Sequence, residues 1–573
     1  MHEESAYNTH QSQEDLPFCA IMYEDAVNNI GEPILLHDVV YDKRTKIVYG
    51  APEIYVPDPF GLGHTFHENL QKYSDRVGQI DSKTLKTETC GSMLRRSIGT
   101  AEALKRLGIG PGDVVSICSI NNFDNAIPFI AAQLIGAKLA SMDPKIGLTD
   151  TEHLLKLVEP KIIFVSQQSE AMIEQAIHNC RMDTLIVVSG GSDRHKSFQE
   201  FSQEAKDVSK FEPYKTKSNK ETAIIMFSSG TTGLSKGICL THYGLACQSH
   251  HLISAGFNFD VCLSYASTYW ISTTMFLTTS LIFGKTRVIA TAFDPNEFWL
   301  IVDQCKVSFI MMAPIQGIAI TRSKRPEHVD TSSLGDIILS GGSFSAESNR
   351  LLKDLVPGTH VQLIYGQTQG AGMVANFRSC DPRDVILFNK KPLSAGRPNV
   401  GFEYKVVDPE TQRNVGMNEH GEIRYKSQCQ MNGYYNMDSS EGFDSDGFVA
   451  TGDVGYYDED FCFYVVDRIK EMLKFRSYHI PPARIENILL THSKVAAVAV
   501  IGVPHEVDGD HPMAVIIPKP NTRPTEKEII KYLDERIDDM YRLRGGVKFV
   551  ETLPYTPSGK VKKNVLKKML LKH

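Results

Sequence analysis

Strand-like and helix-like patterns alternate along most of this 573-residue chain, and that alternation limits the possible folds more than any other feature. Residues 113–119, 161–166 and 185–189 are short runs rich in β-branched side chains, which is typical of buried strands. Residues 123–139, between the first two runs, form an apolar stretch that indicates a helix. Such alternation predicts a layered α/β structure with largely parallel strands.

The sequence changes character at the charged segment 467–470. The remaining hundred or so residues are compact in pattern, with strand patterns near 495–503 and 513–517 and a helix pattern over 526–537. Thr525 and Glu528 predict a capping box at the start of that helix, as Thr149 and Glu152 do for a helix in the first part of the chain. Because 573 residues exceed what one hydrophobic core normally supports, we expect two domains. These are a large N-terminal multi-layer α/β domain, residues 1–469, and a smaller, mobile C-terminal α+β domain, residues 470–573.

Charge and cysteine usage exclude several classes of protein. The formal net charge of −7 argues against a general nucleic-acid-binding protein, which is normally basic. The eleven cysteines show no C-x-x-C pair and no zinc spacing, so we expect reduced thiols and no metal held by cysteine and histidine side chains. The polar, acidic start of the chain lacks the apolar core of a secretion signal.

No stretch has the roughly 18 uninterrupted apolar residues of a membrane helix. Residues 269–284 come closest, and their Ser and Thr content predicts a buried helix beside a pocket instead. We therefore expect a soluble intracellular protein. The last three residues, 571–573, do not form the S-K-L peroxisomal signal.

The segment FSSGTTGLSKG, residues 227–237, predicts a phosphate-binding loop. Glycines and small hydroxyl residues let backbone N–H groups surround anionic oxygens, and a lysine adds a mobile positive charge. Ser235 stands where the G-x-x-x-x-G-K-[ST] template needs glycine, and the two-residue gap between Gly230 and Gly233 does not fit G-x-G-x-x-G. The loop therefore belongs to neither of these two common nucleotide-binding motifs.

Together with further motifs in order, this loop resembles the phosphate loop of the adenylate-forming superfamily. That superfamily includes acyl-CoA synthetases, 4-coumarate–CoA ligases and beetle luciferases. SGGS at 340–343 resembles its adenine-side turn, YGQTQ at 365–369 its Y-G-x-T-E motif, and TGD at 451–453 its T-G-D motif. DRIK at 467–470 resembles its hinge, and PSGK at 557–560 its C-terminal lysine loop. The resemblance covers residues 60–570, and within the superfamily the sequence is most similar to insect luciferase-like acyl-CoA synthetases.

The resemblance implies an AMP-forming acid–thiol ligase. A carboxylate attacks the α-phosphorus of ATP to give an acyl-adenylate and pyrophosphate, and the thiol of coenzyme A then displaces AMP. This chemistry needs positive charge near the transferred phosphorus, from oriented N–H groups, lysines and Mg²⁺. It also needs a dry site, because water hydrolyses the mixed anhydride. The implied partners are ATP, coenzyme A and a small carboxylic acid, with neither nucleic acid nor a membrane segment, and the oligomeric state stays open.

The resemblance also implies a role for each matching residue. The loop residues would hold the β- and γ-phosphates: Ser229, Gly230, Thr231, Thr232 and Lys236. Gly341 and Gly342 would flank the adenine, with Tyr365 stacked on it, and Thr368 would reach the α-phosphate. Asp453 would accept both ribose hydroxyls and Arg468 would bind ribose or phosphate. Lys560 would stabilise charge during adenylation, and Lys474 would act in thioester formation.

Several of these residues have a plainer interpretation. Gly341 and Gly342 alone would indicate an ordinary turn, and Lys560 lies in a basic run that in isolation indicates a solvated helix face. Trp270 could line the substrate pocket or simply pack in the core. The order of the motifs favours the functional interpretation for the first three.

Three positions depart from the family pattern. Gln369 replaces the glutamate that helps hold Mg²⁺, so this ligand contributes an oxygen but no charge. Ser477 replaces a glycine near the channel for the pantetheine arm, and Arg484 replaces an acidic residue. Lys236, Asp453, Arg468 and Lys560 are retained, which favours an active enzyme. The alternatives are a luciferase-like adenylating enzyme with poor thiolation, and a nucleotide- or acyl-binding protein without turnover.

The sequence also indicates the class of acid and the compartment. Family pocket segments correspond to residues 269–274, 311–317 and 369–375, which carry no charged side chain here. Small residues and methionines there predict a roomy apolar slot, suited to a medium- or long-chain fatty acid or an aryl-propenoic acid. The resemblance suggests a role in fatty acid metabolism in the peroxisome, and the cytoplasm is the alternative.

Overall fold

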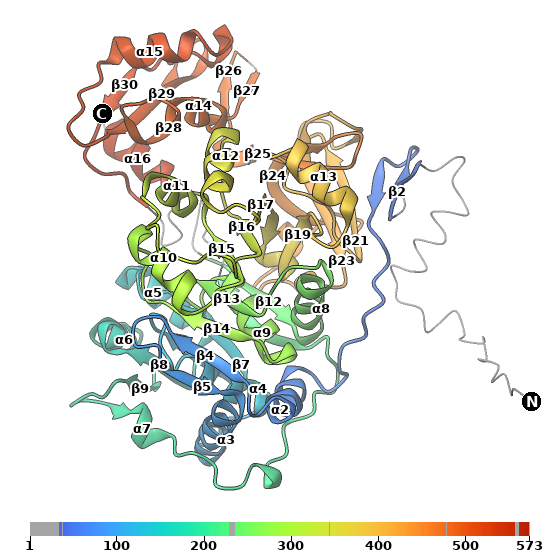
Figure 1. The fold of residues 1–573 in the computed structure, drawn as a ribbon, viewed down its shortest axis with the longest axis vertical. Helices are drawn as coiled ribbons and strands as arrows, with labels where there is room; N and C mark the ends of the chain where they lie inside the picture. The colour runs from blue at the N-terminus through green and yellow to red at the C-terminus, as the bar shows by residue number, and fades with distance from the viewer. Residues whose placement is uncertain are drawn as a thin grey trace, which may run out of the picture.

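The computed structural model describes residues 34–36, 38–227, 235–342, 344–476, 478–555 and 561–571. Figure 1 shows the described chain as an elongated molecule, with helices α2 to α4 at one end and the C-terminal elements at the other. Five β-sheets and the helices packed on them build it. The prediction of an α/β fold, with a large N-terminal part and a smaller C-terminal part, is confirmed.

Two seven-stranded sheets form the centre of the N-terminal part. Each is parallel except for one antiparallel edge pair, β11–β12 in one and β4–β5 in the other. In spatial order the first contains β10 (Lys196–Ser197), β9 (Leu185–Ser189), β8 (Ile162–Ser166), β6 (Val114–Cys118), β7 (Lys138–Met142), β11 (Thr222–Phe227) and β12 (Gly237–Thr241). The second contains β17 (His360–Leu363), β16 (Asp336–Leu339), β15 (Phe309–Met312), β13 (Val261–Ser264), β14 (Thr286–Ile289), β4 (Val77–Asp81) and β5 (Thr87–Thr89).

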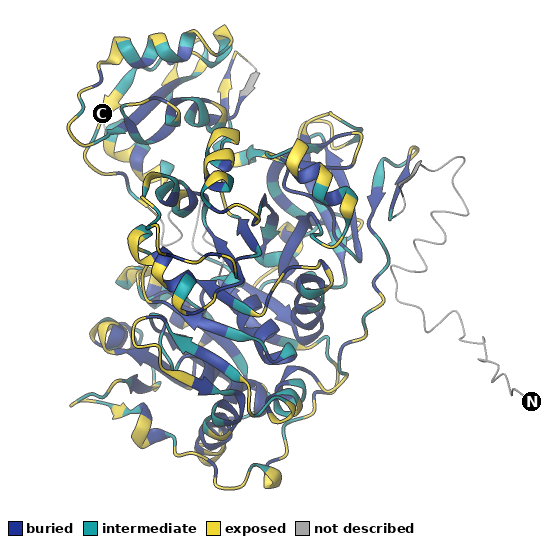
Figure 2. Cartoon of the chain, viewed as in Figure 1, coloured by how far each residue is buried: buried dark blue, intermediate teal, exposed yellow. Residues whose placement is uncertain are grey.

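The central parallel strands of both sheets are buried. All five residues of β6 and of β8 are buried, as expected where both faces of a parallel sheet are covered, and Figure 2 shows the central strands in dark blue. The helices of this part are α2 (Leu62–Lys72), α3 (Cys90–Arg106), α4 (Ala126–Leu134), α5 (Leu148–Val158), α6 (Gln167–Cys180), α7 (Phe198–Phe201), α8 (His242–Ser254), α9 (Ile271–Phe283), α10 (Pro295–Gln304), α11 (Pro314–Arg322), α12 (Ala346–Leu355) and α13 (Pro382–Lys390).

Two antiparallel sheets complete the N-terminal part. The larger contains β1 (Ile34–Leu36), β2 (Val39–Asp42), β3 (Ile47–Tyr49), β21 (Phe402–Val407), β23 (Gly421–Ser427), β24 (Val449–Tyr457) and β25 (Phe463–Arg468), with β22 (Asn414–Val415) paired to β21. The smaller contains β18 (Tyr365–Gln367), β19 (Gly372–Asn376) and β20 (Arg397–Pro398).

The C-terminal part begins after β25 with a short 3-10 turn, η5 (Ile469–Glu471). Its sheet contains β27 (Tyr478–Ile480), β26 (Leu473–Phe475), β29 (Gly509–Pro518), β28 (Val495–His505) and β30 (Val547–Phe549). Its helices are α14 (Pro482–Leu490), α15 (Glu526–Asp534) and α16 (Lys563–Leu570). This sheet and these helices have a hydrophobic core of their own, which includes Ile485, Val500 and Leu533.

Most strand predictions are confirmed, and three helix predictions need correction. The strands predicted at 113–119, 161–166, 185–189, 495–503 and 513–517 are β6, β8, β9, β28 and β29. The helix predicted over 123–139 is α4, which is shorter because the chain turns at Gly136 (φ 76°) and continues as β7. The capping box at Thr149 is wrong: Gly147 is the N-cap and Thr149 lies inside the first turn. At the second predicted box only half of the motif forms: Thr525 accepts a hydrogen bond from Glu528 N at 3.2 Å, while the Glu528 carboxylate pairs with Lys494. The helix there, α15, ends at Asp534 and not at the predicted Ile537.

The helix predicted in 269–284 is confirmed as α9. Ten of its residues are buried, and it ends at Gly284, whose left-handed backbone (φ 60°) suits glycine. Within the described part of the chain, no helix is both long and apolar enough to cross a bilayer.

Candidate active site

Asp453 is the centre of the most connected group of predicted site residues. It lies on β24, directly opposite Arg468 on the neighbouring strand β25. The Arg468 Nε atom is 2.9 Å from Asp453 Oδ1, and the carboxylate is almost fully buried while the guanidinium is about two-fifths exposed. Asp453 raises the pKa of Arg468 above its ordinary value, so this side chain keeps its positive charge. The strand register thus brings the T-G-D motif and the hinge motif together.

A second strand, β18, supplies two further contacts to Asp453. Tyr365 donates its hydroxyl to Asp453 Oδ2 at 2.7 Å, and Gln367 donates its amide to the same oxygen at 2.6 Å. Both side chains leave the same face of β18, since alternate residues of a strand point the same way. Burial and the Asp453 charge raise the pKa of Tyr365 far above its ordinary value, so the phenol stays protonated and donates.

Gln367 is a member of this group that the sequence interpretation missed. Its amide also donates to Thr451 O at 3.3 Å, and its carbonyl accepts from the Tyr425 hydroxyl at 3.3 Å. It occupies the variable position of Y-G-x-T-E, to which the motif assigns no residue type. Its spacing of two residues from Tyr365, which places both on the same face of a strand, could have predicted that it joins this group.

The contacts of Asp453 leave few acceptor positions on its carboxylate. A carboxylate has about four acceptor positions, two on each oxygen. Tyr365 and Gln367 fill Oδ2, and Arg468 takes one position on Oδ1. One position on Oδ1 therefore remains, so the predicted acceptance of both ribose hydroxyls would require Arg468 to move.

The predicted phosphate loop connects β11 to β12, an antiparallel pair at the edge of a parallel sheet. Ser229, Gly230, Thr231 and Thr232 lie outside the described residues. Lys236, directly before β12, places Nζ 2.8 Å from Glu441 Oε2 and 4.7 Å from the centre of the Tyr434 ring. The hydrogen bond to Glu441 raises the pKa of Lys236. The lysine thus already lies beside a carboxylate that an arriving phosphate would have to replace.

The adenine-side turn comes after strand β16 and lies beside β18. Gly341 has φ 87°, a left-handed conformation that favours glycine. Next to it, a Cβ on Gly342 would lie 3.5 Å from Pro314, so this position is less restricted. The turn approaches β18 closely, since a Cβ on Gly366 would lie 3.8 Å from Ser340 Oγ. Ser343 lies outside the described residues.

Thr368 and Gln369 form a single 3-10 turn, η3 (Thr368–Gly370), after β18. The Gln369 carbonyl accepts from Met431 N at 2.7 Å. Gln248 on α8, fully buried and not anticipated from the sequence, holds the end of this turn. Its amide donates to the carbonyls of Gly370 and Met373, each at 2.9 Å, and accepts from Met373 N at 3.1 Å.

Two predicted lysines belong to the C-terminal part. Lys474 is exposed on β26, and no contact among the described residues joins it to the Asp453 group. Lys560, like Ser477, lies outside the described residues. Arg484, one of the departures from the family pattern, donates to the Tyr541 hydroxyl at 2.7 Å and faces its ring.

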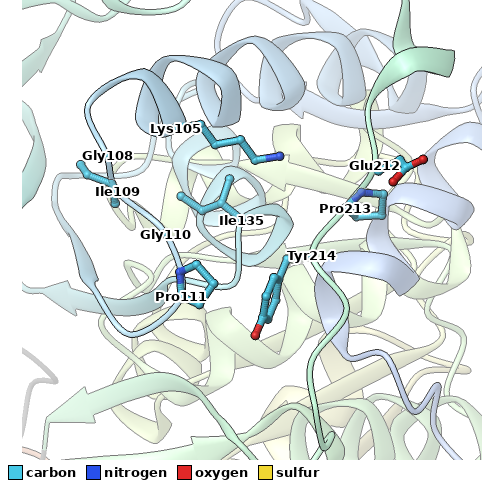
Figure 3. A pocket seen from close by; sticks show the side chains of 9 residues that line it. All are labelled: Lys105, Gly108, Ile109, Gly110, Pro111, Ile135, Glu212, Pro213 and Tyr214. Carbon is cyan, nitrogen blue, oxygen red and sulfur yellow. The ribbon is translucent and has the colours of Figure 1, made fainter.

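Trp270 has a polar partner as well as a packing role. Its indole Nε1 donates to Asp143 Oδ2 at 3.1 Å, and its ring meets Tyr269 edge-on. The hollow shown in Figure 3, about 430 Å³, is elsewhere: residues 108–111 and 212–214 line it with Lys105 and Ile135, and no predicted site residue does. It therefore adds nothing to the nucleotide or acid site.

Family models match both parts of the chain. The model described as AMP-binding enzyme matches residues 66–435. The chain belongs to the AMP-binding enzyme family. The model of the C-terminal domain of AMP-binding enzymes matches residues 484–560.

Relatives of this AMP-binding enzyme include luciferases and CoA ligases. It is 28% identical to the luciferin 4-monooxygenase of Photuris pensylvanica, over 91% of this chain and 98% of that protein. It is also 28% identical to a probable 4-coumarate–CoA ligase of Dictyostelium discoideum, over 90% of this chain and 96% of that protein. The resemblance to adenylate-forming enzymes is thus confirmed.

Solved structures agree with the fold. The luciferase-like enzyme of the nonluminescent mealworm Zophobas morio is 36% identical, with a TM-score of 0.70 over 74% of this chain and 99% of that one. The anthranilate CoA ligase AuaEII, solved with anthranoyl-AMP, is 22% identical, with a TM-score of 0.80 over 90% of this chain and 98% of that one. The family is established by these comparisons, while peroxisomal location is not.

Proposed function

We propose that this AMP-binding enzyme is an ATP-dependent acyl-CoA ligase that forms an acyl-adenylate and then a thioester with coenzyme A. The observation that carries the proposal is the buried Asp453 carboxylate, held by Arg468, Tyr365 and Gln367 from two sheets. A carboxylate fixed in this way is an oriented acceptor for a ribose hydroxyl. Catalysis here depends on positioning charged groups, and such groups act best when they are already in place.

The proposed roles in adenylation rest on these positions. Asp453 binds the ribose, and Arg468 is free on its exposed side to reach ribose or phosphate. Lys236 leaves its ion pair with Glu441 when ATP binds and then contacts the β- and γ-phosphates. The other loop residues that hold these phosphates are Ser229, Gly230, Thr231 and Thr232. The adenine lies beside Gly341, Gly342 and Tyr365. Thr368, at the start of η3 directly after β18, reaches the α-phosphate. Lys560 stabilises negative charge as the acid attacks the α-phosphorus.

Mg²⁺ fits this site through one neutral ligand. The side-chain amide of Gln369 has no hydrogen-bond partner among the described residues, and in the proposed site its oxygen would ligate the cation. Oxygen donors suit Mg²⁺, and the ATP phosphates supply the charge that the amide lacks. When bound, the ion neutralises charge on the phosphates.

The proposed substrate is a medium- or long-chain fatty acid or an aryl-propenoic acid. The predicted pocket segments contain Met311, Met312 and Met373, and no charged residue. Gln248 hydrogen-bonds both the N–H and the carbonyl of Met373, which fixes the backbone after η3. The 4-coumarate–CoA ligase relatives support an aryl acid, and the absence of charged residues from these segments supports an apolar substrate.

We further propose that residues 1–469 and 470–573 act as two domains that change their arrangement between the half-reactions. The chain leaves the last strand of the eight-stranded sheet at Arg468 and enters the five-stranded sheet at Leu473, with only η5 between them. Lys474 then serves thioester formation in the second arrangement.

One experiment separates this proposal from its rivals. ATP–pyrophosphate exchange is measured with a panel of fatty and aryl acids, and coenzyme A is then added. Exchange with subsequent thioester formation supports the ligase. Exchange without thioester supports a luciferase-like adenylating enzyme, which the similarity to luciferin 4-monooxygenases favours. Nucleotide binding without exchange supports a binding protein without turnover.

A further inference from the structure

The hairpin between β28 and β29, in the C-terminal part, carries a group of side chains that the proposed function does not use. His505 ends β28, Asp508 lies in the turn, and His511 is the third residue of β29. The Asp508 Oδ2 atom is 2.9 Å from His511 Nε2 and 3.6 Å from His505 Nδ1. The two imidazole rings stack, with their centres 4.0 Å apart. Two nitrogens therefore meet one carboxylate oxygen within a single hairpin turn.

A neighbouring strand holds the carboxylate in this orientation. Arg476, directly after β26, donates from Nε to Asp508 Oδ1 at 2.7 Å, and its backbone N–H donates to Asp508 O at 2.8 Å. Oδ1 is thus occupied and the other oxygen, Oδ2, faces the histidines. An exposed arginine pair of this kind adds little stability by itself, so its main effect is to fix the direction of the carboxylate.

We propose that His505, Asp508 and His511 form a binding site for a divalent transition-metal ion such as Zn²⁺, Ni²⁺ or Cu²⁺. Imidazole nitrogens prefer these ions, whereas Mg²⁺ and Ca²⁺ prefer oxygen ligands. With metal–ligand bonds of about 2.0–2.2 Å in a tetrahedral site, neighbouring ligand atoms lie roughly 3.2–3.6 Å apart. The two distances to Asp508 Oδ2, 2.9 and 3.6 Å, are close to this range.

The geometry also shows what binding requires. Stacked, nearly parallel rings cannot both contain the same ion in their planes, so one ring has to turn. His505 has 44% of its side chain exposed, against 17% for His511, and therefore has the room. When the His505 ring turns, its Nδ1 atom loses the hydrogen bond that it accepts from Asp508 N at 3.2 Å and coordinates the metal ion instead. Three protein ligands leave the fourth position to solvent, so we expect weaker binding than in closed four-ligand sites.

Metal binding to the full-length protein tests the proposal. The protein is stripped with a chelator and desalted, and Ni²⁺ binding is measured by equilibrium dialysis, since nickel discriminates against the free thiols better than zinc does. We expect His505→Ala and His511→Ala to weaken the strongest binding at least tenfold. The matched control is His328→Ala, another exposed histidine far along the chain from the hairpin.

A second readout identifies the ligands directly. With one equivalent of Cu²⁺, the electron paramagnetic resonance spectrum of the wild type should show coupling to two imidazole nitrogens, and that of His505→Ala to one. Thermal unfolding checks that each variant is folded. Equal Ni²⁺ binding in the wild type and both hairpin variants, or a copper spectrum unchanged by His505→Ala, would overturn the assignment.

Discussion

At the scale of single residues, the hydrogen bonds to Asp453 show which predicted residues contact one another, which a series of motifs along the sequence does not. Two of its partners, Tyr365 and Arg468, belong to recognised motifs, whereas Gln367 does not. A buried carboxylate that loses a hydrogen-bond donor is left partly unsatisfied, which costs more than the bond itself contributes. Gln367 is therefore expected to matter for nucleotide binding although no motif requires it.

We predict that Gln367→Leu raises the KM for ATP in pyrophosphate exchange by about tenfold, because the loss of one bond to a buried carboxylate costs on the order of 1–3 kcal/mol. Tyr425→Phe, which removes only the hydroxyl that donates to Gln367, is the matched control and should give a smaller rise. An unchanged KM for ATP in Gln367→Leu would show that Asp453 does not depend on this amide.

Glu441 should compete with ATP for Lys236. Its carboxylate is 80% exposed and 2.8 Å from Lys236 Nζ, so it gives way to phosphate at a modest cost. We predict that Glu441→Gln lowers the KM for ATP by about two- to fivefold at low ionic strength, and that the difference shrinks as salt screens the pair. A KM that is unaffected at low salt would indicate that Lys236 does not meet the phosphates.

The lack of charge on Gln369 should affect how pyrophosphate exchange depends on the Mg²⁺ concentration. We predict that Gln369→Glu lowers the Mg²⁺ concentration for half-maximal pyrophosphate exchange, because a hard cation favours a charged oxygen. At saturating Mg²⁺ the rates should converge, since the ATP phosphates already supply most of the ligands. Gln369→Ala is the control and should shift the titration the other way. Superimposable Mg²⁺ titrations for Gln369→Glu and wild type would exclude a ligand role.

At the scale of helices and strands, the sequence predicted what depends on local pattern and missed what depends on tertiary contact. The β-branched runs identified β6, β8 and β9 because these strands are largely buried in the sheet. The cap at Thr149 failed because Gly147 starts α5 two residues earlier. The pairing of Lys236 with Glu441 joins residues 205 positions apart and leaves no trace in local sequence.

The candidate site divides in the same way. Ordered motifs predicted Tyr365, Asp453 and Arg468, which the structure brings together across strands β18, β24 and β25. Gln248 was missed because it acts from α8 through the backbone of the turn after η3, and no motif describes that contact. Conversely, Lys474 lies on the C-terminal sheet and has no hydrogen bond or ion pair with this group among the described residues.

The connection η5 should act as a hinge. We predict that Lys470→Pro, which fixes φ at one angle, spares adenylation more than thioester formation, because it favours one arrangement of the two domains. Lys470→Ala is the control, since it removes the side chain but keeps backbone freedom. Pyrophosphate exchange and thioester formation from preformed acyl-adenylate are measured separately. Equal damage to both half-reactions in Lys470→Pro would argue against a hinge at this position.

At the scale of the whole molecule, the proposed function requires one active site to serve two half-reactions with lysines from the part of the chain after η5. Asp453, Arg468 and Tyr365 belong to the N-terminal part, while Lys474 and Lys560 belong to the part after η5. Lys474 is exposed on β26, and among the described residues it forms no hydrogen bond or ion pair with the Asp453 group. A change of domain arrangement is the simplest way to use both lysines.

We therefore predict opposite patterns for two lysine variants. Lys560→Ala should slow adenylation by about 10²-fold or more, the usual cost of one charged donor in an electrostatic site, and leave ATP binding nearly unchanged because the lysine acts in the transition state. Lys474→Ala should leave pyrophosphate exchange within a few-fold of wild type and slow the transfer of a preformed acyl group to coenzyme A.

Lys562→Ala, in the same basic run as Lys560, is the control for a general loss of charge. If Lys562→Ala slowed adenylation as much as Lys560→Ala, the effect would be a general loss of charge and Lys560 would have no specific role. If Lys560→Ala and Lys474→Ala damaged the same half-reaction, the two lysines would not serve separate steps. One fixed arrangement of the domains would then be sufficient, because no step would require the C-terminal part to turn.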